Sequence, residues 1–318
     1  MRDEMRVNFE ASKVKQTRLC EVYMITQTIV QHLFASYCDT SPDMQMISTA
    51  LRQKGIENLV LDHFAVIDLP GPHSGIPVLC EIFSGLGYEE RGRDYLREKQ
   101  NDFLWMAKAG CQMLAAEDAL PQVVAADFRL DEMPPEISNI IYHYSSQASS
   151  TAAAEIRTLM QRGLPCTDRI LQYFAGRDWP LPRVKEFQMV QEFNELLAWV
   201  LIFGRRPNHF SLSIHLLEQF ADLADFHHFV EHETKLTLNE EGGKIKGGIK
   251  AGIAQGSTMG ISQQIQLADG EVQLPTGFAE FVYRYPLCLN KPHQGRWGDY
   301  FTGFIARHAD RVIESLQG

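Results

Sequence analysis

The sequence lacks the surplus of basic residues that draws proteins to nucleic acids. Its 318 residues include 30 Lys and Arg against 40 Asp and Glu, which gives a formal net charge of −10. A field of this sign repels phosphate backbones, and the densest group of lysines, Lys244, Lys246 and Lys250, is too thin to reverse it locally. We therefore expect no nucleic-acid partner.

Long apolar runs and paired cysteines are also lacking. The longest apolar run covers residues 196–203, less than half of the roughly 20 residues that a membrane-spanning helix needs. The first residues are polar and of mixed charge, without the apolar core of a secretion signal. The cysteines lie far apart, and none form the Cys-x-x-Cys pair typical of structural zinc; they are Cys20, Cys38, Cys80, Cys111, Cys166 and Cys288. These absences predict a cytoplasmic protein with reduced thiols and no membrane contact.

The residues that are present predict an α+β fold of four parts. Hydrophobic residues make up 45% of the chain and charged residues 22%, as in ordinary globular proteins. The hydrophobic period is helical in residues 1–58, β-like in 59–130, helical in an insertion at 131–206, and β-like again in 207–318, which ends in a helix. We expect the two β segments to be metal-binding β-α-β-β-β modules that form one cupped sheet.

Local patterns place the elements of the two modules. The segments typical of strands are residues 59–67, 102–109, 122–128, 262–267 and 277–285, and the closing helix is expected at 302–316. A glycine-rich stretch at 241–260 lacks the residue order of a phosphate-binding loop. We interpret it as a mobile loop leading into a strand, with Gln255, Ser257 and Thr258 as polar residues that line a substrate site.

A short motif occurs once in each predicted module. Residues 62–66 read Asp-His-Phe-Ala-Val, and residues 208–212 read Asn-His-Phe-Ser-Leu. Each copy begins a strand that is followed by an amphipathic helix and further strands. Because the context matches on both sides of the motif, it indicates a duplicated unit.

The duplicated motif and one further strand predict a metal site. Side chains alternate between the faces of a strand, so His63 and His209 lie at the same place in each module and point into the same space. Glu280 lies among apolar neighbours in a third strand, where an isolated carboxylate would be costly to bury. Two imidazoles and one carboxylate form the facial set typical of non-haem Fe(II). The alternative for these residues is a pair of hydrogen-bonded core histidines and a salt-bridged glutamate.

Other histidines are weaker candidates. His227, His228 and His232 lie near two glutamates at helical spacing, but their order is not His-Glu-x-x-His, and a solvated helix face is the expected structure.

The sequence resembles the 2-oxoadipate dioxygenase/decarboxylase family, also called 2-hydroxyglutarate synthases. The resemblance covers nearly the whole chain and is carried by segments such as VLDHFAVID, PNHFSLSIH and, most specifically, LPTGFAEFVYR. It implies a fold related to the vicinal oxygen chelate, glyoxalase-like metalloenzymes. It also implies Fe(2+) held by His63, His209 and Glu280. The implied reaction takes a small 2-oxo acid and O2, most specifically 2-oxoadipate, to 2-hydroxyglutarate with release of CO2, a step in lysine catabolism.

One position departs from the family pattern. Characterised members place an arginine four residues after the first histidine, where it holds the distal carboxylate of the substrate, and this chain has Ile67 there. Arg284 shares the predicted face of Glu280 and is the expected replacement, so the implied substrate-binding residues are His63, Arg284 and Ser257. The alternative functions are a glyoxalase-like metal-dependent isomerase or hydrolase, which a fourth protein ligand would favour, and a non-catalytic binding protein. The sequence leaves the oligomeric state open, and a homo-oligomer is one of the outcomes it allows.

Overall fold

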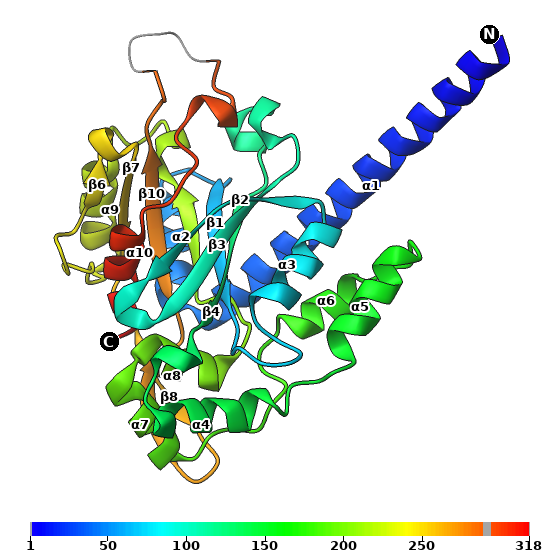
Figure 1. Ribbon diagram of the computed structural model, residues 1–318. Coiled ribbons are helices and arrows are strands. Elements are labelled where there is room, and N and C mark those ends of the chain that lie inside the picture. The colour runs from blue at the N-terminus through cyan, green and yellow to red at the C-terminus, as the bar shows by residue number, and fades with distance from the viewer. Residues whose placement is uncertain (1, 289–293, 318) are drawn as a thin grey trace.

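The computed structural model describes residues 2–288 and 294–317 of the chain, with side chains from residue 21 onward. Its centre is a curled sheet of eight strands in the order β2-β3-β4-β1-β5-β10-β7-β6 (Figure 1). The strands are β1 (Leu61–Ile67), β2 (Tyr88–Leu96), β3 (Asn101–Lys108), β4 (Gln122–Phe128), β5 (His209–Ser213), β6 (Lys246–Gly248), β7 (Ile253–Ser257) and β10 (Phe278–Arg284).

The sheet consists of two halves built on the same plan. In the first half the strand order is β1-β4-β3-β2, and in the second it is β5-β10-β7-β6. The first strand of each half is followed by a helix, α3 (Ile76–Gly85) or α9 (Leu223–Thr234), and pairs in parallel with the last strand of its own half. The halves meet where β1 and β5 pair antiparallel. The predicted α+β fold with two β-α-β-β-β modules in one cupped sheet is therefore confirmed.

Helices fill the two remaining segments of the chain. Before the first module lie α1 (Arg2–Thr40) and α2 (Pro42–Gln53). Between the modules lie α4 (Pro135–Ser145), α5 (Ala152–Gln161), α6 (Thr167–Tyr173), α7 (Val184–Phe193) and α8 (Glu195–Phe203). These helices fall within the two segments that the sequence predicts as helical, and the division at residues 58, 130 and 206 stays our proposal. Among the described residues, no helix combines the length and the apolar character that crossing a membrane requires.

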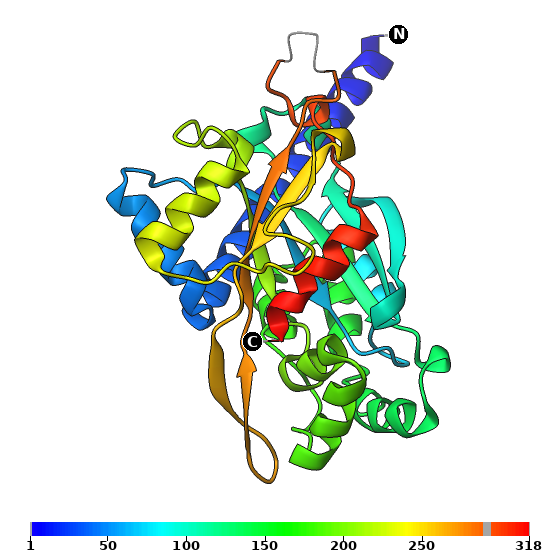
Figure 2. The same cartoon turned by 90° about the vertical axis from the view of Figure 1, so that its left-hand side faces the viewer.

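The two faces of the sheet carry different side chains, as strand alternation predicts. Phe64 and Val66 of β1 and Phe210 and Leu212 of β5 are fully buried on the outer face, in a core shared with α1, α2, α3 and α9. Each such side chain contributes about 1.5–3 kcal/mol through its removal from water. The opposite, inner face of the sheet carries the histidines and several small residues, and α10 (Ala306–Ile313) lies across it (Figure 2).

Three strands of the main sheet, β2, β6 and β7, were not predicted from the sequence. The edge strand β2 was not predicted, because its sequence, YEERGRDYL, is largely charged and exposed and has no apolar alternation. Strands β6 and β7 lie inside the glycine-rich stretch 241–260 that we interpreted as a mobile loop. Glycines at positive φ allow this stretch to turn between the two strands; Gly252, at φ 74, is one of them.

The segment at 262–267 forms a strand, but not one of the main sheet. It is β8 (Ser262–Gln266), which pairs only with β9 (Glu271–Pro275) in a separate hairpin that projects from the body (Figure 2). The hairpin is inserted between β7 and β10 of the second module. The closing helix is also shorter than predicted, because α10 begins at Ala306 and its last turn is a 3₁₀ turn at Glu314–Leu316.

Candidate metal centre and cavity

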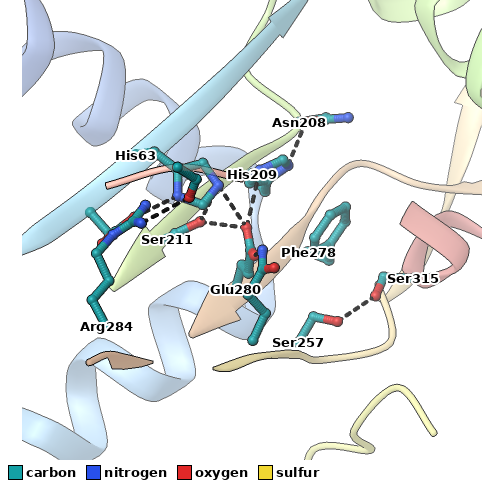
Figure 3. Close-up of polar contacts among 12 residues, drawn as sticks. His63, Asn208, His209, Ser211, Ser257, Phe278, Glu280, Arg284 and Ser315 are labelled. Carbon is teal, nitrogen blue, oxygen red and sulfur yellow. Dashed lines mark hydrogen bonds and ion pairs between the residues drawn. The ribbon is translucent and has the colours of Figure 1, made fainter. Parts of the chain in front are cut away.

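Three neighbouring strands bring the predicted ligands together. His63 lies on β1, His209 on β5 and Glu280 on β10, and the strand registers align Ser211 of β5 with both His63 and Glu280. One ligand-type atom from each of the three side chains lies within 4.8 Å of the other two. All three residues are buried on the inner face of the sheet (Figure 3). The convergence that strand alternation predicts is therefore present.

A single carboxylate oxygen is the meeting point of the group. Glu280 Oε2 lies 3.1 Å from His63 Nε2 and 3.2 Å from His209 Nε2. The Ser211 hydroxyl donates to the same oxygen and lies 3.1 Å from His63 Nε2. The other oxygen, Glu280 Oε1, accepts a hydrogen bond of 2.8 Å from Gln255 Nε2. The carboxylate is thus held in place on both sides.

The residue before each histidine fixes the orientation of its ring. Asp62 Oδ1 lies 2.8 Å from His63 Nδ1. Asn208 Oδ1 lies 2.8 Å from His209 Nδ1 (Figure 3). An oxygen acceptor at Nδ1 holds the proton there and leaves the Nε2 lone pair free for a metal. The pairing of β1 with β5 shifts register between Leu61 and His63. At this irregularity the Asp62 carboxylate lies beside the ring of His63.

Asp62 and Asn208 are candidate functional residues to which the sequence analysis gave no role. The signal was present, because each occupies the first position of the repeated motif. A hydrogen-bond acceptor directly before each of two matching histidines is what a pair of oriented metal ligands requires.

Electrostatics distinguish the two histidines. Burial opposes a charge on His63, but the adjacent Glu280 carboxylate and the bond to Asp62 outweigh it and raise the pKa of His63 to about 9. Burial dominates at His209 and lowers its pKa to about 4, although Glu280 acts in the other direction. Burial also opposes ionisation of Glu280, but the charge on His63 outweighs it and lowers the pKa of Glu280 to about 2. These shifts favour a protonated His63 beside an ionised Glu280 when no metal is bound.

The donor set fits a divalent transition metal. It offers two imidazole nitrogens and one carboxylate oxygen, and the carboxylate charge that attracts a proton also attracts a cation. Three protein ligands leave positions open for other molecules. In the part of the chain that the structure describes, this is the only group of three or more His, Cys, Asp or Glu side chains close enough to share an ion.

The second histidine cluster does not assemble into a comparable group. His228 and His232 are exposed on α9, as a solvated helix face predicts. His227 differs from that expectation, because it is buried and its ring packs edge-on against Phe281.

Arg284 lies behind the metal-ligand group. Its guanidinium donates to both oxygens of Asp62, at 2.7 and 2.8 Å, and to the carbonyls of Phe301 and Gly303, at 2.8 and 3.0 Å. Burial alone would raise the pKa of Asp62, but the charge of Arg284 outweighs it and lowers that pKa. Arg284 therefore holds Asp62 ionised beside His63. It is not among the residues that line the cavity, where we expected it to meet a substrate.

Of the three polar residues that we expected to line a substrate site in the glycine-rich stretch, one lies at the cavity and two lie elsewhere. Gln255 lies at the cavity. Ser257, expected at the substrate, is fully buried, and its hydroxyl is 2.9 Å from that of Ser315 (Figure 3). Thr258 donates to the Asp43 carboxylate of α2. The structure thus places only Gln255 of the three beside the candidate metal ligands.

A cavity extends from the three ligands over the first module. Its walls on β1 to β4 are Ala65, Ile67, Leu96, Asn101, Phe103, Val124 and Ala126. Phe304 and three residues of the C-terminal segment, Ala309, Val312 and Ile313, cover it. The ring of Phe304 lies edge-on to His63, with centroids 4.7 Å apart. A bound molecule would therefore contact the metal at one end and hydrocarbon along most of its length.

Comparison with known proteins places the chain in a family. The family model described as 2-oxoadipate dioxygenase/decarboxylase matches residues 18–294. The chain belongs to this family. A relative from rice, Oryza sativa, named 2-oxoadipate dioxygenase/decarboxylase and chloroplastic/amyloplastic, is 26% identical over 304 residues, which cover 91% of this chain and 78% of the relative. A chloroplastic relative of the same name from Arabidopsis thaliana is 24% identical, with 91% of this chain and 76% of the relative covered.

Solved structures agree on the fold. The crystal structure of rice hydroxyglutarate synthase in complex with 2-oxoadipate matches with a TM-score of 0.77 at 24% identity, covering 93% of each chain. A glyoxalase superfamily protein from Ralstonia eutropha matches with a TM-score of 0.68 at 17% identity, covering 88% of this chain and 85% of its own. The expected family and its glyoxalase-like fold are both confirmed.

Proposed function

We propose that this member of the family is an iron(II)-dependent dioxygenase/decarboxylase of a small 2-oxo acid. The observation that carries the proposal is the buried His63, His209 and Glu280 group at the end of a largely apolar cavity. Family membership supports the class of reaction. In the relatives' reaction, 2-oxoadipate and O2 would give 2-hydroxyglutarate and CO2, as in lysine catabolism, and 2-oxoadipate is the reference substrate for assays.

The protein's own residues supply placement and a dry site. A bound iron(II) ion would supply open positions at which a 2-oxo acid and O2 meet. His63, His209 and Glu280 would hold the ion, while Asp62 and Asn208 retain the protons on the histidine Nδ1 atoms. Phe304 and the C-terminal segment would exclude bulk water from the reacting end, which keeps reactive species from side reactions.

The isomerase alternative requires a fourth protein ligand, and strand register identifies where the duplication would place it. Ala65 aligns with Val124 on β4, just as Ser211 aligns with Glu280 on β10. The position in the first module that matches Glu280 is therefore a valine. This supports the three-ligand oxygenase over a four-ligand isomerase or hydrolase. Metal analysis of the purified protein separates both from a metal-free binding protein.

A reducing compartment such as the cytoplasm is our proposal for the location. Among the described residues, Cys38, Cys80, Cys111, Cys166 and Cys288 are free thiols.

The direct test is an oxygen-electrode assay of protein that has been loaded anaerobically with iron(II). A panel of 2-oxo acids that includes 2-oxoadipate should reveal O2 consumption matched by CO2 release. The Glu280→Ala variant should consume no O2 beyond the rate of buffer with iron. If the metal-loaded protein consumes no O2 with any acid of the panel, the proposed function is wrong.

A further inference from the structure

The cavity has two chemically different ends. At one end lie His63, His209, Glu280 and Gln255, which are polar and can meet the 2-oxo and carboxylate oxygens of a substrate. Away from them the walls are hydrocarbon, apart from the amide of Asn101. We infer that the cavity selects a 2-oxo acid whose far end is uncharged and apolar, an inference that rests on the proposed function and narrows its substrate class.

The direction of β1 shows where the far end lies. Ala65 and Ile67 follow His63 on the same face of this strand, so they lead away from the ligands in steps of two residues. Ala65 aligns with Val124 and Ile67 with Ala126 on the adjacent strand. All of these except Val124, which is partly exposed, are buried. A substrate chain that extends along β1 would therefore lie between four aliphatic side chains.

The opposite wall is also hydrocarbon. Phe103 of β3 aligns with Ala126, and Val312 and Ile313 close the cavity from the C-terminal segment. Asn101 is the polar residue at this end, and its side-chain nitrogen already donates to the carbonyl of Asp127 at 2.7 Å. Among the described residues that line the cavity, none is a lysine or an arginine.

The nearby buried cations bind other partners. Arg284 pairs with Asp62 on the far side of the ligand group. Lys99, close to Asn101 in sequence, pairs with Glu195 and Glu314. Lys246 donates to the carbonyl of Asn239 at 2.8 Å. A second carboxylate on the substrate would have to displace one of these contacts or remain unpaired against hydrocarbon.

An unpaired carboxylate in such surroundings is strongly disfavoured. A buried charge without a partner loses its hydration and gains no compensating interaction. A methyl group of the same reach loses nothing and fills apolar space. We expect the protein to prefer the methyl-ended acid over the dicarboxylate by at least about tenfold.

The test compares two acids with the same six-carbon chain, 2-oxohexanoate and 2-oxoadipate. Binding of each to metal-loaded wild-type protein is measured by calorimetry without oxygen, and turnover is then measured with O2. The expected product from 2-oxohexanoate is 2-hydroxypentanoate plus one CO2 for each O2 consumed. Tighter binding and higher kcat/KM for 2-oxohexanoate support the inference.

The contrary results are distinct from one another. If 2-oxoadipate binds tighter and is turned over faster, the inference is wrong and the proposed function stands. If neither acid binds the metal-loaded protein and neither is turned over, the proposed function fails and the inference with it.

A substitution locates the effect. Ile67→Arg places a cation against the far end, and it should shift the kcat/KM ratio toward 2-oxoadipate by at least about tenfold. The matched variant Ile67→Met keeps hydrocarbon at this position and should keep the wild-type order of the two acids. The same shift in both variants would contradict an effect of charge. The wild-type comparison decides the inference even if Ile67→Arg does not fold.

Discussion

The two β modules share a strand plan, yet they contribute different chemistry to the shared site. The first module provides His63 and then hydrocarbon, because Val124 lies where Glu280 lies in the second module. The second provides His209 and the only carboxylate of the described ligand group. Duplication thus accounts for the symmetric placement of two ligands. The difference between the modules accounts for a candidate metal site that is open on the side where the cavity lies.

The contacts behind the two histidines also differ. His63 is backed by an ionised Asp62 that Arg284 neutralises, whereas His209 is backed by the neutral amide of Asn208. A charged acceptor strengthens the hydrogen bond to the ring, but it requires a buried counter-ion. The first module therefore depends on a salt bridge between β10 and β1, and the second does not.

The largest effect is expected from removing the one ligand that breaks the symmetry. Glu280→Ala should lower metal affinity by more than about 100-fold and abolish metal-dependent O2 consumption, because the site then lacks its anion. Metal content measured after dialysis against a weak chelator checks this. His228→Ala, in the exposed cluster on α9, is the control and should keep the wild-type metal content. Equal losses in the two variants would show that the ligands are misassigned.

The next largest effect is expected from making the first module resemble the second. Asp62→Asn leaves the buried Arg284 without its carboxylate partner. The free energy of unfolding of the metal-free protein should fall by about 3–5 kcal/mol, since an uncompensated buried charge is costly. Urea denaturation measures this change. The exposed Asp118→Asn variant is the control and should unfold like the wild type. A loss below about 1 kcal/mol in Asp62→Asn would show that this salt bridge contributes no more than a surface ion pair.

A smaller effect is expected behind the other histidine. Asn208→Ala removes a neutral acceptor from His209 Nδ1 and leaves no buried charge behind. Metal affinity should fall by about 10–100-fold, as is typical when a partner of a ligating histidine is lost. The stability of the metal-free protein should fall by about 1 kcal/mol. A stability loss as large as that of Asp62→Asn would refute the proposed difference between the modules.

The smallest effect is expected at a contact that braces only the second module. The buried Tyr37 hydroxyl of α1 donates to the carbonyl of Phe278 at the start of β10. Tyr37→Phe should cost about 1 kcal/mol of stability and leave metal affinity unchanged. A fall in metal affinity, measured by the same chelator competition, would show that α1 positions Glu280 through β10.

The sequence predicted the convergence of the three candidate ligands because local rules govern where they lie. The repeated motif and strand alternation marked His63 and His209, and the position of a lone carboxylate in an apolar strand marked Glu280. Fold class followed from the change in hydrophobic period along the chain. These signals need no knowledge of long-range contacts.

The other parts of the site depend on contacts between distant segments. Arg284 shares a strand with Glu280, but its partner, Asp62, is more than 200 residues away in the sequence. From the sequence alone, a substrate carboxylate was an equally good partner for this arginine. The sequence indicated only that Val312 and Ile313 lie on the apolar face of a C-terminal helix. Nothing in it indicated that this face covers a cavity. The edge strand β2 escaped notice because backbone pairing with β3, rather than apolar alternation, makes it a strand.

In the structure proposed for the loaded protein, two duplicated strands and one divergent strand together hold a single metal ion. The most direct measurement is anomalous X-ray diffraction from crystals of the iron-loaded protein, grown and kept without oxygen. The account predicts one strong anomalous peak bonded to His63 Nε2, His209 Nε2 and Glu280. A fully loaded protein whose anomalous peak lies elsewhere, for example beside His228 and His232 on α9, would contradict it.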